Sequence, residues 1–230
     1  MRFFTKTKKG FTLTELLIAM AVLAIIAAVT VPSMVTITNK KNFTNGLKKA
    51  TLILKTVTSE IMADNSGTFA WTFTGPNTYA NVFGQKMPFI KVCLANLNPG
   101  ECFANSWKTL QGTNSWVDTN TLDRAILSNG MTIAFRTFSW TCAHVLYTRN
   151  GNNPEGCGYL YVDTNGLKGP NVAGRDIFEF VLTKYNGILP SGAPGTASAV
   201  VLDRCSTTSV NFMNGQNCGA KVLTEGVMNY

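Results

Sequence analysis

Glu15 is the single charged residue between Gly10 and Asn39, and it lies at the start of a long apolar run. A charged side chain on a helix in hydrocarbon costs about 2.5–3.5 kcal/mol at the bilayer centre and less near an interface. Such a residue therefore usually has a partner of opposite charge and a function. The chemistry that Glu15 offers is ion pairing in an apolar environment. A plainer interpretation is that the carboxylate lies at the level of the lipid headgroups. A helix N-terminus favours an anion, so this interpretation is compatible with a role in ion pairing.

Six cysteines form a second group of reactive residues, and all of them follow the apolar run. Their spacings lack the close pairs of zinc sites, so a disulfide framework on the outer side of a membrane fits better. The alternative is a set of partly reduced, buried thiols in a cytosolic protein. Many connectivities are possible, but we favour sequential pairing because each pair then brackets a turn-rich loop, such as residues 151–154. The expected pairs are Cys93 with Cys102, Cys142 with Cys157, and Cys205 with Cys218.

Asp163, Asn165 and Asp176 form a third candidate constellation, in the stretch DTNGLKGPNVAGRD. Acidic and amide oxygens at one-residue spacing, followed by a second carboxylate, are typical of calcium loops. The match is incomplete, because an apolar residue stands where a further oxygen is expected and Lys168 and Arg175 oppose a dication. A structural turn is therefore the favoured interpretation, calcium is the alternative, and no other metal or cofactor is expected.

The remaining titratable residues predict no catalytic group. His144 follows Cys142 by two positions, but a disulfide would remove that thiol, and a histidine of a strand or loop is the simpler interpretation. The sequence has no glycine-rich phosphate loop, and its tryptophans are expected to pack in a core rather than to stack on bases. We therefore predict that the protein is not an enzyme.

The formal charge of +8 raises the question of a nucleic-acid partner. Half of that excess comes from four basic residues that precede Gly10, namely Arg2, Lys6, Lys8 and Lys9. The rest of the chain is only mildly basic, and its next lysine cluster lies just beyond the apolar run, where lysines commonly mark a water interface. Binding of nucleic acid is therefore not expected.

A long N-terminal helix must position Glu15. The apolar run from Leu16 to Val31 is close to the ~20 residues that span a bilayer, and Phe11 and Leu13 extend it. We place the transmembrane part at about residues 13–33. The basic residues before it favour a cytoplasmic N-terminus, which places the rest of the chain, with its cysteines, outside.

The periodic pattern continues beyond this span. Apolar residues recur at alternating steps of four and three, the spacing that forms one helical face. They are Phe43, Leu47, Ala50, Leu54, Val57 and Ile61. One helix from Phe11 to about Asp64 can carry both patterns, apolar on all sides in its first half and amphipathic in its second. Pro32 and Gly46 are possible places for a bend, and residues 65–67 supply the stop.

The rest of the chain indicates a β-rich head. Short apolar runs alternate with turn residues, which is typical of strands joined by tight connections. Strands are predicted at residues 131–138, 158–162 and 176–182, with a shorter pair within 220–230, and a helix at 121–127. We expect the sheet to cover the apolar stripe of the long helix, giving an α+β fold with an antiparallel, disulfide-bonded sheet.

The sequence KKGFTLTELLIAMAVLAIIAAVTVPSM, which starts at Lys8, resembles the N-terminal segment of type IV prepilins and type II secretion pseudopilins. The shared features are a basic leader, a glycine before the cleaved bond, a phenylalanine after it, a glutamate four residues later and an apolar helix with a proline. The resemblance is specific from Lys8 to about Ser33, little more than a tenth of the chain. The cysteine-rich head has no match as strong.

This resemblance implies that a membrane prepilin peptidase cuts between Gly10 and Phe11 and that the new amine is N-methylated. The chain would then divide into a leader (1–10), the long helix (11–64) and a globular head (65–230). The cut creates an α-amine with a reference pKa of roughly 7.7–8.0, which is cationic near neutral pH. In a filament core made of apolar helices, Glu15 of a neighbouring copy can supply its counter-ion, because an unpaired charge there is expensive.

The resemblance also implies the partners and the location. We predict a structural subunit of a type IV pilus-like filament whose partners are copies of itself or related pilins, the prepilin peptidase/methyltransferase and an inner-membrane assembly platform. Before assembly it would be a single-pass inner-membrane protein with a periplasmic head, and afterwards part of a cell-surface filament or a periplasmic pseudopilus. A pseudopilin of a type II secretion system is the alternative, and a minor pilin with a DNA- or surface-binding head is a second one. The enlarged, disulfide-bonded head favours a pilus, whereas a calcium site is known in the heads of some pseudopilins.

Overall fold

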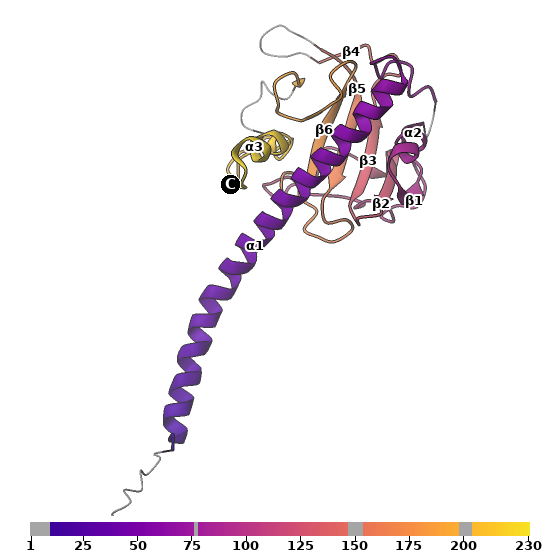
Figure 1. Cartoon of the computed structure of the whole chain (residues 1–230). Coiled ribbons are helices and arrows are strands. Elements are labelled where there is room, and N and C mark those ends of the chain that lie inside the picture. Colours follow the sequence, from indigo (N-terminus) through magenta and orange to yellow (C-terminus); the bar gives the residue numbers. More distant parts are fainter. Residues whose placement is uncertain (1–9, 76–77, 147–153, 198–203) are drawn as a thin grey trace, which may run out of the picture. The chain divides into compact units, whose positions relative to one another are not determined.

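The structure is a computed structural model of the chain, and it describes residues 10–75, 78–146, 154–197 and 204–230. These residues belong to two compact units that meet between Asn39 and Lys40. Figure 1 shows the order of the elements along the chain. The basic leader before Gly10 and the turn predicted at residues 151–153 lie outside the described residues.

Helix α1 (Leu13–Asp64) runs through both units and confirms the predicted long helix. In the first unit its apolar side chains are exposed. The hydroxyls of Thr30 and Thr36 donate to backbone carbonyls four residues earlier, at 2.9 and 3.0 Å, so they are satisfied within the helix without water. Among the described residues, α1 is the one helix that is long and apolar enough to cross a membrane, by length and composition.

In the second unit, α1 buries one face. The predicted stripe is confirmed: five of its six residues are at most 5% exposed, and Phe43 is partly buried against the same cluster. Leu52, on another face of the same helix, is 69% exposed. The helix ends near the predicted stop, where the Gly67 amide donates to the Met62 carbonyl at 2.7 Å. Gly67 has a φ of +80°, which favours glycine at this helix end.

Seven strands of the described residues form one sheet, in the order β1-β2-β3-β5-β6-β7, with β4 paired to β5 (Figure 1). All of these pairings are antiparallel. The strands are β1 (Phe89–Cys93), β2 (Asp123–Leu127), β3 (Thr132–Thr137), β4 (His144–Val145), β5 (Glu155–Asp163), β6 (Ile177–Thr183) and β7 (Ile188–Pro190). The other elements are α2 (Thr78–Lys86), the 3₁₀ helix η1 (Thr119–Thr121) and α3 (Cys218–Glu225). The strands predicted at 131–138, 158–162 and 176–182 correspond to β3, β5 and β6.

The central strands of the sheet are buried on both faces. On its inner face, side chains such as Phe135, Leu160 and Phe180 share one apolar cluster with the buried stripe of α1. On its outer face, Tyr161 packs with residues of the long connection between β1 and β2, including Trp107. The two layers explain why every residue of β6 is buried, because a strand covered on both sides has no solvent face.

Two predictions for the head were wrong. Residues 121–127 form no helix; they end η1 and form β2, because pairing with β1 and β3 outweighs the local preference of so short a segment. Residues 220–230 form no strand pair, and their first part belongs to α3. Gly226, which would have formed the turn of the predicted pair, caps this helix in the left-handed conformation, and its amide donates to the Val222 carbonyl.

Gly46 has a different use from the bend that we considered. A Cβ atom placed on Gly46 would lie 2.8 Å from the Cβ of Thr164, closer than real Cβ atoms approach. The absence of a side chain therefore lets α1 pack closely on the start of the β5–β6 connection. The α-helix continues through both Pro32 and Gly46.

Three disulfides join the cysteines in the sequential order that the loops favour: Cys93–Cys102, Cys142–Cys157 and Cys205–Cys218. The paired cysteines are 9, 15 and 13 residues apart. In the chain-entropy account, loops of this size each stabilise a fold by about 3 kcal/mol. The disulfides therefore hold long irregular connections against a sheet that has few residues per strand.

Candidate functional site

The start of α1 is organised by Thr12 and Glu15. The Thr12 carbonyl accepts the first helical hydrogen bond, from the Leu16 amide at 3.2 Å. The Thr12 hydroxyl accepts from the Glu15 amide at 3.2 Å, and Glu15 Oε2 accepts from the Thr12 amide at 2.8 Å and from its hydroxyl at 2.9 Å. This reciprocal arrangement is a capping box, which satisfies backbone donors that a helix start leaves unpaired.

Thr12 is the functional residue that our sequence reasoning missed. The spacing Thr-x-x-Glu at residues 12–15 is the sequence signal of a capping box and was available in the printed sequence. The sequence analysis assigns Glu15 a role in ion pairing, on the basis of its charge alone. The structure adds a second role, because the same carboxylate caps its own helix.

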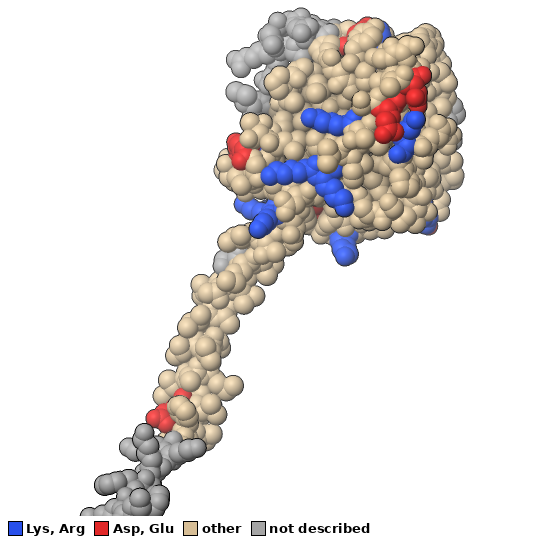
Figure 2. Space-filling view, viewed as in Figure 1, with Lys and Arg blue, Asp and Glu red and all other residues tan. Residues whose placement is uncertain are grey.

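The bond between Gly10 and Phe11 lies just before this cap. Gly10 is exposed, and a Cβ atom added to it would have no neighbour within 4 Å. The Phe11 side chain is 90% exposed. In the first unit, Figure 2 shows acidic atoms at the start of the described helix and no lysine or arginine along it. A hydrolase can therefore reach this bond, and a new amine on Phe11 would be four residues from Glu15.

Comparison with known proteins decides what this segment is. Residues 5–31 match the prokaryotic N-terminal methylation motif. The chain carries this methylation motif. The motif is characteristic of the precursors of type IV pilins and pseudopilins, and it confirms the resemblance found in the sequence. No curated protein and no solved structure matches the chain.

The methylation motif covers Gly10, Phe11 and Glu15 but ends before the second unit begins. The roles predicted for these three residues therefore stay predictions. Proteins with this motif are structural subunits made as membrane-anchored precursors, and the apolar first half of α1 agrees with such an anchor.

The predicted calcium loop connects β5 to β6. Asp163 ends β5, and its Oδ1 accepts from the Asn165 amide at 3.2 Å. Asp176 is also buried, and its two oxygens accept from the amides of Asn171 and Val172 at 2.8 and 2.7 Å. Burial and, after it, the charge of Asp176 together raise the pKa of Asp163 to about 9. The structure thus brings the two predicted carboxylates into electrostatic contact at one end of the sheet.

Several oxygens of this region have no hydrogen-bond partner among the described residues. They are Asp163 Oδ2, Asn165 Oδ1, Asn171 Oδ1 and the hydroxyl of Thr132, which lies opposite Asp163 in the β3–β5 register. Oxygen donors of this kind suit calcium, whereas the described residues hold no group of three or more His, Cys, Asp or Glu side chains that could bind a metal. The two cations of the loop, Lys168 and Arg175, are exposed to solvent. The donor set fits a hard cation in type, and backbone carbonyls or water would have to complete it.

His144 does not form a reactive pair with Cys142. Cys142 is bonded to Cys157, so it has no thiol. The His144 ring instead lies 4.5 Å from the ring of Phe138, measured between centroids. This agrees with the simpler interpretation of His144 as a strand residue.

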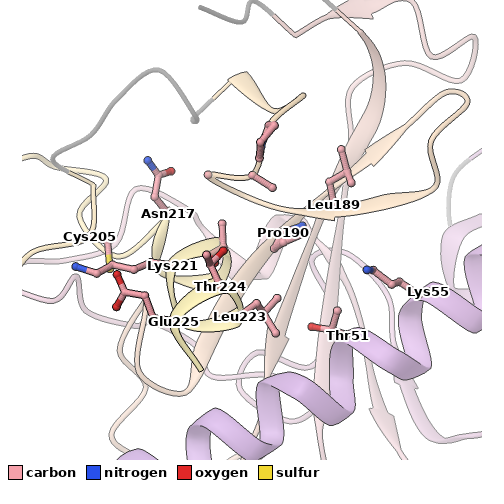
Figure 3. Close-up of a pocket in the computed structure, with 14 residues that line it drawn as sticks. Thr51, Lys55, Leu189, Pro190, Cys205, Asn217, Lys221, Leu223, Thr224 and Glu225 are labelled. Atoms are coloured by element: carbon pink, nitrogen blue, oxygen red, sulfur yellow. The ribbon is translucent and has the colours of Figure 1, made fainter. Parts of the chain in front are cut away.

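A groove of about 590 Å³ lies between α1, α3, β7 and the segment after β7 (Figure 3). Leu189, Pro190 and Leu223 contribute apolar surface, and Lys55 and Lys221 contribute positive charge. The one carboxylate of the lining is Glu225, and the lining cysteine, Cys205, is held in a disulfide. The groove therefore offers packing surface and charge but no nucleophile with an adjacent base.

Proposed function

We propose that the protein is the structural subunit of a type IV pilus-like filament and that it assembles through the first half of α1. The observation that carries this proposal is the position of the methylation motif, directly at the start of an apolar helix segment whose large side chains are exposed. An apolar helix needs either lipid or other apolar helices around it. A membrane anchor and a filament core satisfy this need in succession.

The proposed sequence of events uses residues at the start of the chain. The precursor waits as a single-pass inner-membrane protein with its head in the periplasm. Prepilin peptidase cleaves after Gly10, and the amine of Phe11 is methylated. The cationic end of an incoming subunit then pairs with Glu15 of a neighbouring copy, which compensates both charges in the apolar core and fixes the axial position.

The surroundings of Glu15 support this role in a specific way. Its Oε2 is occupied by Thr12 of the same chain, which holds the carboxylate at the helix start. A carboxylate can accept about four hydrogen bonds through its two oxygens, so capping leaves capacity for a second partner. The cap thus positions the acceptor before the neighbouring amine arrives.

The head favours a pilus over a pseudopilus. Three disulfides and a sheet covered on both faces suit a surface that is exposed outside the cell. In this proposal the assembly platform of the inner membrane and other copies of the chain are the partners, and the final location is a cell-surface filament.

The proposal is tested by mass spectrometry of the protein from its native cells. The expected N-terminus is a methylated Phe11, recovered from sheared surface filaments. Gly10→Val should yield the uncut precursor in the membrane, because the structure leaves room for a side chain at this position and the change affects recognition by the peptidase rather than folding. An unmodified N-terminus, or mature protein that stays in the periplasm in secretin-dependent structures, would refute the pilus proposal.

We also propose that the β5–β6 loop binds calcium, an assignment favoured by its unpaired buried oxygens. The residues that would hold the ion are Asp163, Asn165 and Asn171. When bound, calcium would neutralise Asp163 and Asp176 and thereby stabilise the loop. Calcium should raise the Tm of the full chain in detergent more than magnesium does, and Asp163→Asn should abolish this difference. The exposed Asp118→Asn serves as the matched control, and an equal response to both metals would contradict the site.

A further inference from the structure

The second half of α1 begins with a dense group of lysines. Residues 40–59 contain five lysines and no aspartate or glutamate. The formal charge of the whole chain is +8, and the leader supplies half of it, so this one helical segment carries more positive charge than the other half of the excess. The five are Lys40, Lys41, Lys48, Lys49 and Lys55.

Three of these lysines share one face of the helix. Lys41, Lys48 and Lys55 follow one another at steps of seven residues, which is close to two full turns, and all three are exposed. The face lies opposite the buried stripe, because exposed Leu52 belongs to it. Figure 2 shows lysine and arginine side chains together on the face of the head that α1 crosses. We call this surface the lysine face.

Two of the five lysines are already used within the head. Lys40 Nζ donates to the Tyr230 carbonyl at 2.7 Å, and Lys48 Nζ donates to the Gly226 carbonyl at 3.3 Å. The other three form no hydrogen bond or ion pair within the part of the chain that the structure describes; they are Lys41, Lys49 and Lys55. Their positive charges are therefore available to another molecule.

A second copy of this chain is a poor match for these charges. Three carboxylates that it could offer are held in ion pairs by lysines of their own chain, at 2.5–2.6 Å: Asp64 with Lys86, Glu101 with Lys91 and Glu155 with Lys184. An anionic membrane, in contrast, presents a continuous layer of phosphate groups. Charge complementarity therefore favours lipid headgroups over another subunit.

The helix itself brings Lys41 to such a layer. Lys41 follows Ile37, an exposed apolar residue of the first unit, by four residues, which is about one helical turn. The same helix, α1, is long and apolar enough to cross a membrane. Lysines next to a membrane span are attracted by anionic headgroups, and the attraction falls off within a Debye length, which is about 8 Å at physiological ionic strength.

We propose that the start of the lysine face binds the anionic headgroups of the membrane that α1 spans, through Lys41 and, more weakly, its neighbour Lys49. The inference rests on the proposed membrane-anchored precursor. Lys49 lies about 12 Å beyond Lys41 along the helix, where its flexible side chain can still reach toward the headgroups. Lys55 lies about 21 Å beyond Lys41 and is screened from them. A subunit must release this contact when it leaves the membrane for a filament.

The headgroup contact is tested by electron paramagnetic resonance of the full chain in phosphatidylcholine vesicles whose protein heads face outward. Spin-labelled phosphatidylglycerol or phosphatidylcholine is added to the outer leaflet, so that the leader on the other side is not sampled. The spectrum separates lipid that is immobilised by the protein from free lipid. We expect phosphatidylglycerol to be preferred at low ionic strength and the preference to fall at about 0.5 M salt, where charges are screened.

Three matched variants locate the contact on the helix. Lys41→Gln should lower the preference by about twofold, and Lys49→Gln should lower it less, because the attraction decreases with distance from the surface. Lys55→Gln is the control, since it removes an equally exposed and unpartnered lysine that lies beyond the screening length. All three changes are at exposed helix positions and should leave the fold intact.

The results separate this inference from the proposed anchor. Immobilised lipid without a preference for phosphatidylglycerol would overturn the headgroup contact alone, whereas the absence of any immobilised lipid would refute the anchor as well. A preference that survives the double variant Lys41→Gln and Lys49→Gln would also overturn it, and so would an equal loss in Lys55→Gln. Duplex DNA binding that this double variant loses, with an unchanged lipid preference, would assign the lysine face to nucleic acid instead.

Discussion

Both halves of α1 carry large apolar side chains, but they expose them to different extents. From Leu13 to Ile37 the large apolar side chains are 50% or more exposed, whereas from Leu47 to Ile61 one stripe is buried at 5% exposure or less. The second half has a sheet to cover its stripe, and the first half is exposed among the described residues. The difference shows that a continuous helix can serve two purposes, to hold a folded head and to offer an unpaired surface for lipid and for other subunits.

The carboxylates of the two units show the same contrast. Glu15 in the first unit is exposed and makes its hydrogen bonds to Thr12 within one helical turn. Asp163 in the second unit is fully buried beside a second carboxylate. The charge of Glu15 is available to another molecule, whereas burial favours the protonated, uncharged form of Asp163.

The strongest test of this comparison is Glu15→Gln. Glutamine can keep the capping box because its amide oxygen still accepts, but it removes the negative charge. Removing one partner of a buried ion pair costs about 3–5 kcal/mol, so we expect normal insertion and cleavage but at least a tenfold loss of filaments, measured as sheared protein. Thr12→Ala is the control: it loses the cap, at about 1 kcal/mol, but keeps the charge and should still assemble. Normal filaments from Glu15→Gln would show that Glu15 acts only as a cap.

The second test compares two leucines of α1. Leu54→Ala removes a side chain that is 2% exposed and should lower the free energy of unfolding of the head by about 2–5 kcal/mol. Leu52→Ala removes a side chain that is 69% exposed and should change it by less than about 0.5 kcal/mol. Denaturant titration followed by tryptophan fluorescence measures both. Similar losses in the two variants would mean that the sheet does not cover the stripe as described.

The third test removes a disulfide from the second unit. Cys142→Ala together with Cys157→Ala should lower the free energy of unfolding by about 3 kcal/mol, because it releases a loop whose ends are 15 residues apart. Membrane insertion of the precursor should not change, since the first unit contains no cysteine. Carbonate extraction of membranes measures insertion, and a loss of both properties would contradict the independence of the two units.

The fourth test concerns the contact between Gly46 and Thr164. Gly46→Ala places a methyl group 2.8 Å from the Thr164 Cβ and should cost about 1–3 kcal/mol, although alanine is the better helix former. Asn45→Ala, at an exposed position next to it, should be neutral or slightly stabilising. Thermal unfolding of both variants separates packing from helix propensity. A gain in stability from Gly46→Ala would show that the helix can move away from the β5–β6 loop.

The fifth test concerns a pH dependence that belongs to the second unit. Asp163 holds its proton up to about pH 9 in the folded head but only to about pH 4 when unfolded. Between these values the native state binds more protons, so its stability falls as the pH rises, by at most about 1.4 kcal/mol per pH unit. Unfolding from pH 5 to 8 in the presence of a chelator measures this slope. Asp163→Asn should flatten it, and an unchanged slope would assign the dependence to another group.

The parts of the fold that the sequence predicts are those with a strong period. The stripe from Phe43 to Ile61 depends on burial against a single surface, and it is found in the structure. The segments that were misjudged are short. In β2, pairing with two neighbours decided the structure, and around Gly226 a helix cap and a hairpin turn require the same left-handed residue. Such choices depend on contacts that are distant in the sequence.

Only some residues of the candidate site could be predicted from the sequence, for a related reason. Gly10, Phe11 and Glu15 lie within one short motif, so their spacing alone identifies the segment. The capping role of Thr12 was readable from the same four residues but was overlooked. The packing of Trp107, Tyr161 and Glu179 on the outer face of the sheet could not be found in this way, because these residues come from three separate segments that only folding brings together.

The order of the disulfides has a consequence for how the head matures. The six cysteines are paired in chain order, the first with the second, the third with the fourth and the fifth with the sixth. When the head follows its membrane anchor into an oxidising compartment in chain order, Cys102 meets one free thiol, Cys93, and the same holds for the two later pairs. The correct partner is then also the earliest available one, and the head can oxidise without an isomerase that corrects mispaired cysteines.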